Sequence, residues 1–374
     1  LSITGDTLFL DGEMTGLALA GQTGGTLTLH ASDVTVTSDP HRAVSGLNAD
    51  SELPIDKKGL VLSTGQLTDS GFTHINLKSV RDLVVERGVH LQPSHARLQP
   101  GSSTSSGRQP RYSAFSGSNS NAWQVQYSDD GRPLLDDLGA SSINLASGKN
   151  FTSGGLASFE ITALEKNRTL IERGAEITVG PKGAISVSGL GVEIDGVLDA
   201  PAGSVAVTAT STDALVGTDA LILGEEARIL AQGWNEPGSR PVSDLPRSHT
   251  PHDGGSVTLT SEGTLRIAKG AKVDASAAPV TKTSLDGYRN ETQATVSGNP
   301  GQVYLSFADR LELDGRISAQ ATWLSGRGGE LTVTNSEIGN DWALANADFE
   351  PWIEGGFDAI TLLSYSDLIF DGKI

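Results

Sequence analysis

Hydrophobic and polar residues alternate along short stretches of this chain. The clearest stretch covers residues 254–275, where Val257 and Leu259, and then Leu265 and Ile267, stand two positions apart with polar residues between them. This period is typical of β-strands, because successive side chains of a strand point to opposite faces. Glycine-containing corners separate the apolar pairs. The stretch therefore predicts a unit of strand, corner, strand and corner.

The same unit recurs along the chain. Each copy has apolar residues two apart, a glycine corner, and another apolar residue. The corner takes two forms, Asp-Gly-x-apolar and basic-Gly-Ala-x-apolar. Copies contain Gly12, Gly88, Gly174, Gly196, Gly224, Gly270, Gly315 and Gly372. Gly-Gly pairs precede several copies, at 24–25, 254–255, 328–329 and 355–356.

Self-similarity of this kind indicates a stacked array of repeats. We predict an all-β fold, a right-handed parallel β-helix (solenoid) with two or three sheets and with loop excursions from the coils. Roughly 10 to 13 coils at about 4.8 Å each give a rod on the order of 50 to 60 Å long.

A solenoid grows by adding coils, so 374 residues need not divide into several domains. We interpret residues 1–374 as a single β-helix segment. The repeat pattern stops at four excursions, at about 38–60, 92–139, 233–253 and 277–300. One short helical turn is expected around residues 342–347.

Composition agrees with a slender aliphatic core. Hydrophobic residues are 37% and aromatic residues 5% of the chain, and the 45 glycines are expected to supply positive-φ corners. The net charge of −18 argues against nucleic-acid binding and against adsorption to an anionic membrane. There is no cysteine, no apolar run of the ~18 residues that a membrane span requires, and no signal peptide at Leu1. We expect the chain to be a segment cut from something longer, with neighbouring coils or another subunit as partners at its cut ends.

The closing sequence carries a family resemblance. Residues 355–362, GGFDAITL, lead to residues 368–372, LIFDG. Together with the repeated Asp-Gly and Gly-Gly units, this resembles the filamentous haemagglutinin family of two-partner secretion exoproteins. The Asn-Pro-Asn-rich secretion signature of that family is missing, so the resemblance points to an internal or C-terminal-side β-helix segment.

The resemblance implies a function and a location. Proteins of this family leave Gram-negative cells through an outer-membrane transporter partner. They form surface or released fibres for adhesion, biofilm cohesion or display of a distal domain. The expected role is therefore a structural and adhesive stalk segment, extracellular or on the cell surface, with a glycan or protein of a host or neighbouring cell as ligand. No enzymatic activity and no cofactor are expected.

A carbohydrate-active β-helix enzyme, either a polysaccharide lyase or an inverting glycosidase, is the alternative. Glu193 and Asp195 flank one inward position, and Glu312 and Asp314 flank another. Two residues along a strand place the carboxylates roughly 7 Å apart, which suits an inverting glycosidase. However, the spacing occurs in two repeat copies, where the Asp also belongs to the corner. We therefore assign no catalytic residue.

Metal and nucleotide sites find little support. Oxygen ligands for Ca²⁺ are available in one acidic loop, although the spacing is not that of an EF-hand and a solvated loop is the simpler interpretation. Its carboxylates are Asp129, Asp130, Asp136 and Asp137. His249 and His252 lack a third zinc ligand nearby. No P-loop is present.

Aromatic residues gather in the second excursion. They are Tyr112, Phe115, Trp123 and Tyr127. One interpretation makes them a surface for stacking on sugars or docking a protein. The other, which we prefer, is that they form the small core of the excursion itself.

Overall fold

The structure is a computed structural model. It describes residues 1–10, 14–16, 25–43, 59–68, 70–93, 96–98, 135–137, 142–146, 168–210, 219–237, 249–285, 291–322 and 327–371.

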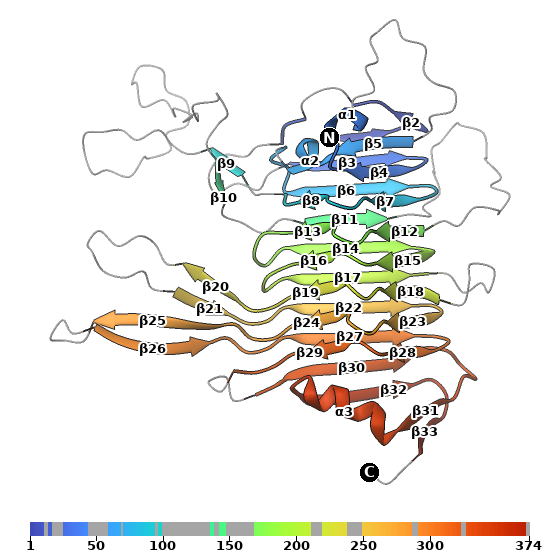
Figure 1. The fold of residues 1–374 in the computed structure, drawn as a ribbon, viewed down its shortest axis with the longest axis vertical. Helices are drawn as coiled ribbons and strands as arrows, with labels where there is room; N and C mark the ends of the chain where they lie inside the picture. Colours follow the sequence, from blue (N-terminus) through green and yellow to red (C-terminus); the bar gives the residue numbers. More distant parts are fainter. Residues whose placement is uncertain are drawn as a thin grey trace, which may run out of the picture.

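Three stacked parallel sheets confirm the predicted parallel β-helix (Figure 1). The largest is a ten-stranded sheet. In spatial order it contains β1 (Ser2–Thr4), β3 (Thr26–Ala31), β6 (His74–Ser79), β11 (Ser142–Ala146), β14 (Ala184–Gly189), β17 (Ser204–Ala209), β22 (Ser256–Ser261), β27 (Gln302–Phe307), β30 (Gly329–Asn335) and β32 (Phe357–Ser364).

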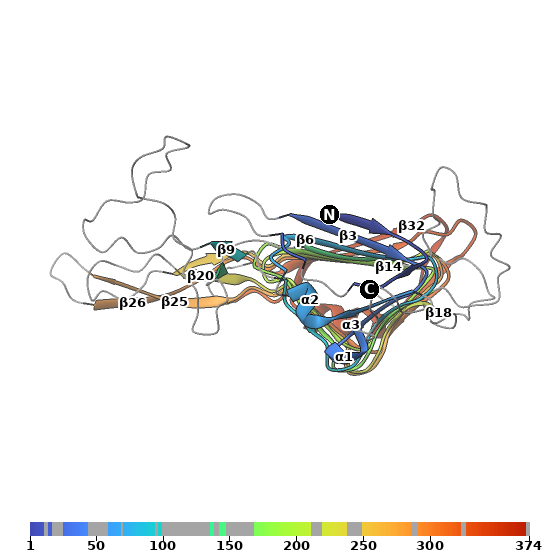
Figure 2. The same cartoon turned by 90° about the horizontal axis from the view of Figure 1, so that it is seen from above.

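The other two sheets complete the coils. The nine-stranded sheet contains β2 (Thr7–Leu8), β5 (Gly59–Ser63), β4 (Val34–Thr37), β7 (Leu83–Val85), β12 (Arg168–Ile171), β15 (Gly191–Ile194), β18 (Asp219–Leu223), β23 (Thr264–Ile267) and β28 (Leu311–Leu313). The six-stranded sheet contains β8 (His90–Leu91), β13 (Glu176–Thr178), β16 (Val197–Asp199), β19 (Arg228–Leu230), β24 (Lys272–Asp274) and β29 (Arg316–Ser318). Seen from above, the sheets enclose a narrow triangular core (Figure 2).

The core consists of aliphatic columns that run along the axis. Val205, Val257, Val303 and Leu331 are register partners on four successive strands of the ten-stranded sheet, and each is at most 1% exposed. The residues between them, such as Thr258, face outward, as the alternating burial of β22 shows. The predicted alternation of faces along β22 is therefore confirmed.

Corner glycines are required for two different reasons. In the corners where glycine follows a basic residue, Gly88, Gly174 and Gly270 have φ between 74° and 100°, which is the left-handed region that favours glycine. The Asp-Gly corners lack this conformation at Gly196 and Gly315. There a methyl group would approach a backbone carbonyl oxygen of the preceding coil, at 2.5 Å and 2.7 Å respectively. The expectation that corner glycines supply positive φ is therefore wrong at Gly196 and Gly315.

Three antiparallel hairpins leave the described coils on one side (Figures 1 and 2). They are β9–β10 (Ala96–Leu98 and Leu135–Asp137), β20–β21 (Trp234–Pro237 and His249–His252) and β25–β26 (Pro279–Leu285 and Glu291–Ser297). Each departs after a strand of the six-stranded sheet and returns to a strand of the ten-stranded sheet. The hairpins therefore project from one corner of the triangle.

The first excursion differs from the others. It begins with α1 (Pro40–Ala43), and β5 then returns between β2 and β4 in the nine-stranded sheet. This part of the chain consequently stacks out of sequence order. A second short helix, α2 (Thr64–Thr68), follows β5.

The helical turn expected at residues 342–347 is wrong in position. Residues 342–345 form strand β31 (Trp342–Ala345), which pairs with β33 (Leu368–Asp371), because Trp342 and Leu344 alternate with exposed alanines. The helix, α3 (Asn346–Glu354), comes directly afterwards and contacts β29 at the end of the six-stranded sheet. Its Trp352 is 1% exposed. The helix thus covers the last strand of that sheet.

Candidate functional site

A ladder of glycines lies beneath the hairpins, where each coil enters the ten-stranded sheet. Gly203, Gly255, Gly301 and Gly329 come from successive coils, and a methyl group on any of them would overlap the backbone or Cβ of a neighbouring coil. The coils approach so closely because their backbones hydrogen-bond there. The Gln302 N–H, for example, donates to Gly255 O at 3.0 Å. The Gly-Gly pairs of the sequence therefore mark positions without room for a side chain.

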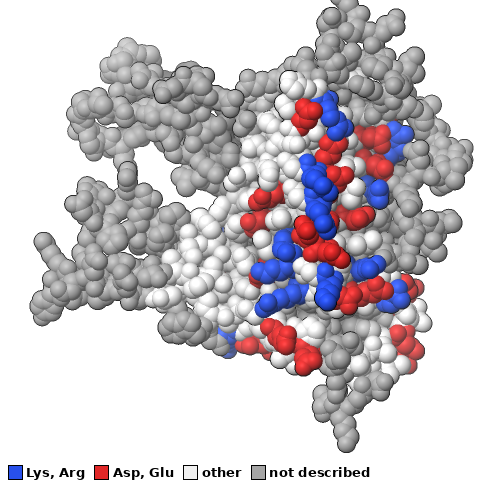
Figure 3. Space-filling model, in the orientation of Figure 1, with Lys and Arg blue, Asp and Glu red and all other residues white. Residues whose placement is uncertain are grey.

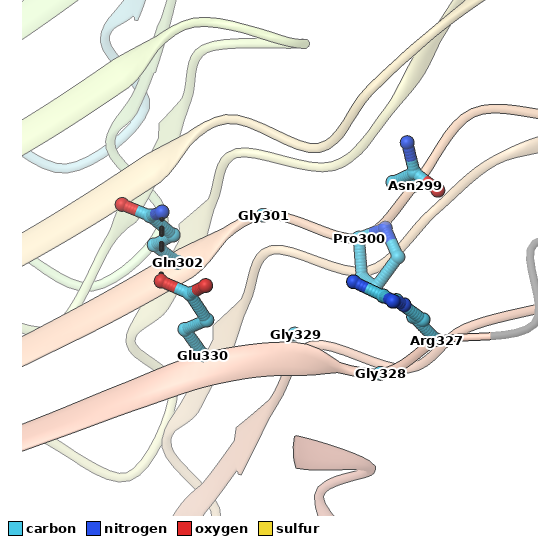
Figure 4. Close-up of a pocket in the computed structure, with 8 residues that line it drawn as sticks. All are labelled: Asn299, Pro300, Gly301, Gln302, Arg327, Gly328, Gly329 and Glu330. Atoms are coloured by element: carbon cyan, nitrogen blue, oxygen red, sulfur yellow. Dashed lines mark hydrogen bonds between the residues drawn. The ribbon is translucent and has the colours of Figure 1, made fainter. Parts of the chain in front are cut away.

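Because these glycines have no side chains, a hollow lies at this corner. It has a volume of about 640 Å³. Its lining residues are Asn299, Pro300, Gly301, Gln302, Arg327, Gly328, Gly329 and Glu330. Figure 4 shows Gln302 and Glu330 at one end and Asn299, Pro300 and Arg327 at the other, with the glycines between them. We call this hollow the corner groove.

A second hollow of about 370 Å³ adjoins the corner groove and shares Arg327 and Gly328 with it. It is also lined by Gln320, Thr322 and Asp358. Arg327 thus stands between two open polar depressions.

Strand pairing positions one end of the corner groove. Gln302 and Glu330 are register partners at outward positions of β27 and β30. The amide Nε2 of Gln302 donates to Glu330 Oε2 at 2.9 Å. This bond leaves the second carboxylate oxygen of Glu330 and the amide oxygen of Gln302 facing solvent-accessible space, since both side chains are exposed.

Backbone contacts position the other end. The Asn299 N–H donates to Asp253 Oδ1 at 2.7 Å, and the Asn299 carbonyl accepts from Gly254 N at 2.8 Å. These bonds fix the base of the hairpin β25–β26 against the preceding coil. Arg327 is exposed and forms no ion pair with another residue in the described part of the chain.

The groove offers hydrogen-bond donors and acceptors side by side. Arg327 and the two amides donate, while Glu330, Asp358 and the amide oxygens accept. A floor of glycine lets a flat molecule approach the backbone closely. These features suit a polar, polyhydroxylated ligand better than an apolar one.

Three of the four carboxylates in the two predicted pairs, Glu193, Asp195 and Glu312, are engaged in ion pairs. Glu193 lies 3.6 Å from Arg168, and Asp195 lies 3.1 Å from Arg173. Asp195 also accepts from the Glu226 N–H at 2.9 Å, which ties two coils together.

The second pair is similar at Glu312. That carboxylate lies 2.8 Å from Arg310 and 3.7 Å from Arg266. Glu312 thus has two arginine neighbours, Arg266 on β23 and Arg310 directly before β28, which is the edge strand of the nine-stranded sheet.

Charged side chains follow the corner between the nine-stranded and six-stranded sheets. Successive coils place Glu86 and Arg87, Glu172 and Arg173, Asp195, Glu225 and Glu226, Lys269 and Asp314 between their strands. Basic and acidic groups form a stripe along the face shown in Figure 3. Because several of them pair between coils, this stripe is mainly a structural feature.

Two carboxyl groups near the hairpin side have shifted pKa values. Burial, with a smaller contribution from the charge of Glu176, raises the pKa of Asp199 above its usual value. Burial also acts on Asp274, but hydrogen bonds from Lys272 and Ser276 outweigh it, and the pKa of Asp274 is lowered. Asp274 is 3% exposed and accepts from Lys272 Nζ at 2.6 Å.

In the described part of the chain, none of the other predicted site residues lines the corner groove. The four aromatics Tyr112, Phe115, Trp123 and Tyr127, together with Asp129 and Asp130, lie outside the described residues. Asp136 and Asp137 belong to β10, and His249 and His252 belong to β21. The His252 ring stacks on Trp234 with centroids 5.5 Å apart.

Within the described ranges, no group of three or more His, Asp or Glu side chains is placed to hold a metal ion. Likewise, none of the helices described above is long and apolar enough to cross a membrane.

Sequence reasoning missed the residues of the corner groove. It singled out the Gly-Gly pairs but not Gln302, Arg327 and Glu330. The available signal was the polar residue next to the glycines of each coil, because stacking brings such residues together.

The fold and the groove define a class, a parallel β-helix protein with lateral hairpins and an open polar surface groove. Comparison with protein-family models, with curated proteins and with solved structures finds no match to this chain.

Proposed function

We propose that this chain is a structural and adhesive stalk segment of a large bacterial exoprotein, exposed on the cell surface or secreted. The observation that carries the proposal is the continuous stack of the ten-stranded sheet, from β1 to β32, with every strand pair parallel. Such a stack holds side groups at fixed positions along a rod. That is what a fibre segment has to do.

The direction of the hydrogen bonds supports a mechanical role. Strands run across the rod, so the bonds between neighbouring coils point along its axis. Load along the axis is then shared among the three sheets of each coil. The aliphatic columns add continuous burial in the same direction, with each fully buried side chain contributing about 1.5–3 kcal/mol.

The hairpins support display. They leave the rod from a single corner, and two of them contact each other, with β21 lying against β25 and β26. A surface presented on one side of a fibre suits contact with a neighbouring cell or matrix. The resemblance to filamentous haemagglutinins adds export through an outer-membrane transporter partner of a Gram-negative cell.

The enzyme alternative gains no support from the carboxylates. General acid–base chemistry on a glycosidic bond requires two carboxyl groups free to exchange protons with substrate and water. Glu193, Asp195 and Glu312 are instead paired with arginines. We therefore do not propose hydrolysis or lyase activity.

Immunogold electron microscopy of intact cells tests the proposal. Antibodies raised against this chain are expected to label fibres outside unpermeabilised cells of the bacterium that encodes it. A strain with the coding region deleted is the control. Labelling that appears only after permeabilisation would refute a surface or secreted stalk.

A further inference from the structure

We propose that the corner groove and the hollow beside it bind an uncharged oligosaccharide. The inference deepens the adhesive part of the proposed function and rests on it, since it names the class of ligand that the stalk would hold. The shape of the groove, the chemistry of its walls and the charge of the chain all support this ligand class.

The shape favours a flat ligand with exposed edges. The groove is open, and its floor is formed by Gly301, Gly328 and Gly329. Because no side chain rises from these positions, a sugar ring can lie close to the backbone. A deep apolar pocket of the kind that encloses most small hydrophobic ligands is a different kind of site.

The wall chemistry matches hydroxyl groups. Each sugar hydroxyl both donates and accepts, so it is best bound where donors and acceptors alternate. Glu330 and Asp358 accept strongly from hydroxyls, while Arg327 and Asn299 donate to ring and hydroxyl oxygens. Gln302, held by Glu330, presents its amide oxygen as a further acceptor.

The charge distribution selects an uncharged saccharide over an acidic one. The whole chain carries a net charge of −18, and two carboxylates flank the single arginine of the combined groove. A uronate or sulfate group would meet Arg327 but also Glu330 and Asp358. Repulsion from those carboxylates disfavours such ligands.

A peptide strand fits less well. Strand addition requires a sheet edge with free N–H and C=O groups. At the groove the coil backbones are already bonded to one another, as in the bonds from Gln302 N to Gly255 O and from Glu330 N to Gly301 O. A bound peptide would leave its own backbone largely unpaired.

The test begins with a glycan array. The purified chain is applied to uncharged oligosaccharides of glucose, mannose and galactose, and to oligogalacturonates and sulfated oligosaccharides as the acidic set. Retention of at least one uncharged glycan is expected. Retention of acidic glycans alone, or of none, would overturn the proposal.

Calorimetric titration of the retained glycan then locates the site. Arg327→Gln and Glu330→Gln are each expected to weaken binding about tenfold or more, the effect of losing one charge-assisted hydrogen bond. Arg266→Gln and Glu312→Gln are matched controls, because they make the same changes on the nine-stranded sheet, and they should leave the affinity unchanged. Equal effects in both sets would refute the groove as the site.

Folding and function can be separated in this design. All four substitutions replace exposed or partly exposed surface side chains, and circular dichroism melts verify that each variant folds. Failure of glycan binding would leave surface labelling of cells intact. Failure of the labelling would refute the stalk while the binding measurement still stood on the isolated chain.

Discussion

Replacing Gly301 with alanine is the sharpest perturbation of the glycine ladder. The new methyl carbon would overlap Gly255 O and lie 2.7 Å from the carbonyl carbon of Gly254. Carbon atoms in contact normally stand about 3.5–4.0 Å apart, so one coil must move by about 1 Å. The movement acts on backbone that cannot rotate away as a side chain can.

The size of the effect follows from three contributions. Overpacking costs about 1–3 kcal/mol. The displaced coil also strains the bonds from Gly301 N to Ala275 O, at 2.7 Å, and from Gln302 N to Gly255 O, at 3.0 Å. Each is worth about 1 kcal/mol net. Alanine restricts the unfolded chain and returns about 0.4–1 kcal/mol, so we expect a net loss of about 2–4 kcal/mol.

Gly339→Ala is the matched control. Gly339 has a φ of 89° but nothing within 4 Å of an added methyl group, so it reports the cost of the left-handed conformation without a clash. That cost is on the order of 1–2 kcal/mol. Urea unfolding followed by circular dichroism gives both midpoints. If Gly301→Ala destabilised the chain no more than Gly339→Ala, the close-approach explanation of the ladder would be refuted.

Three further substitutions test the faces and the buried charges. Val257→Asp places an unpaired charge in the core and should lower the free energy of unfolding by more than about 4 kcal/mol. Thr258→Lys, on the outward face, should lower it by less than about 0.5 kcal/mol. Equal melting temperatures of the two variants would contradict the assigned faces. Asp274→Asn should cost about 2 kcal/mol at neutral pH, because the carboxylate that bonds Lys272 is lost. The folded pKa of Asp274 is lowered, so the stability that its carboxylate contributes is present above the unfolded pKa and is lost as pH falls through the folded pKa. A stability difference between wild type and Asp274→Asn that grew in acid would contradict this assignment. The folded pKa of Asp199 is raised, so wild-type stability should fall as pH rises from the unfolded pKa towards the folded pKa. Urea titrations of Asp199→Asn should no longer show that fall. A variant with an unchanged pH dependence would exclude Asp199 as the cause.

The local pattern of the sequence determined the strands and their faces. Alternation is a property of neighbouring residues, so Val257 and Leu259 could be assigned inward and Thr258 outward before any coil was placed. Repetition of the unit then required stacking, because one coil cannot bury its own apolar face. Corner glycines were also visible, although the two reasons for them at Gly88 and Gly196 were not. A positive φ and a close approach to a neighbouring coil both require glycine, so the sequence alone does not distinguish the two reasons.

Tertiary structure alone decided which distant residues meet. Gln302 and Glu330 are 28 residues apart, and their contact depends on how much chain each coil spends on its excursions. The return of β5 between β2 and β4 is also a non-local feature. Leu60 pairs with Leu8 of β2 and with Val34 of β4, and the sequence around Leu60 does not indicate either partner. The helix after Trp342 also escaped the pattern, because α3 is held by packing of Trp352 against the end of the stack rather than by its own periodicity. Contacts between coils are non-local, and local alternation contains no information about the length of chain that separates them.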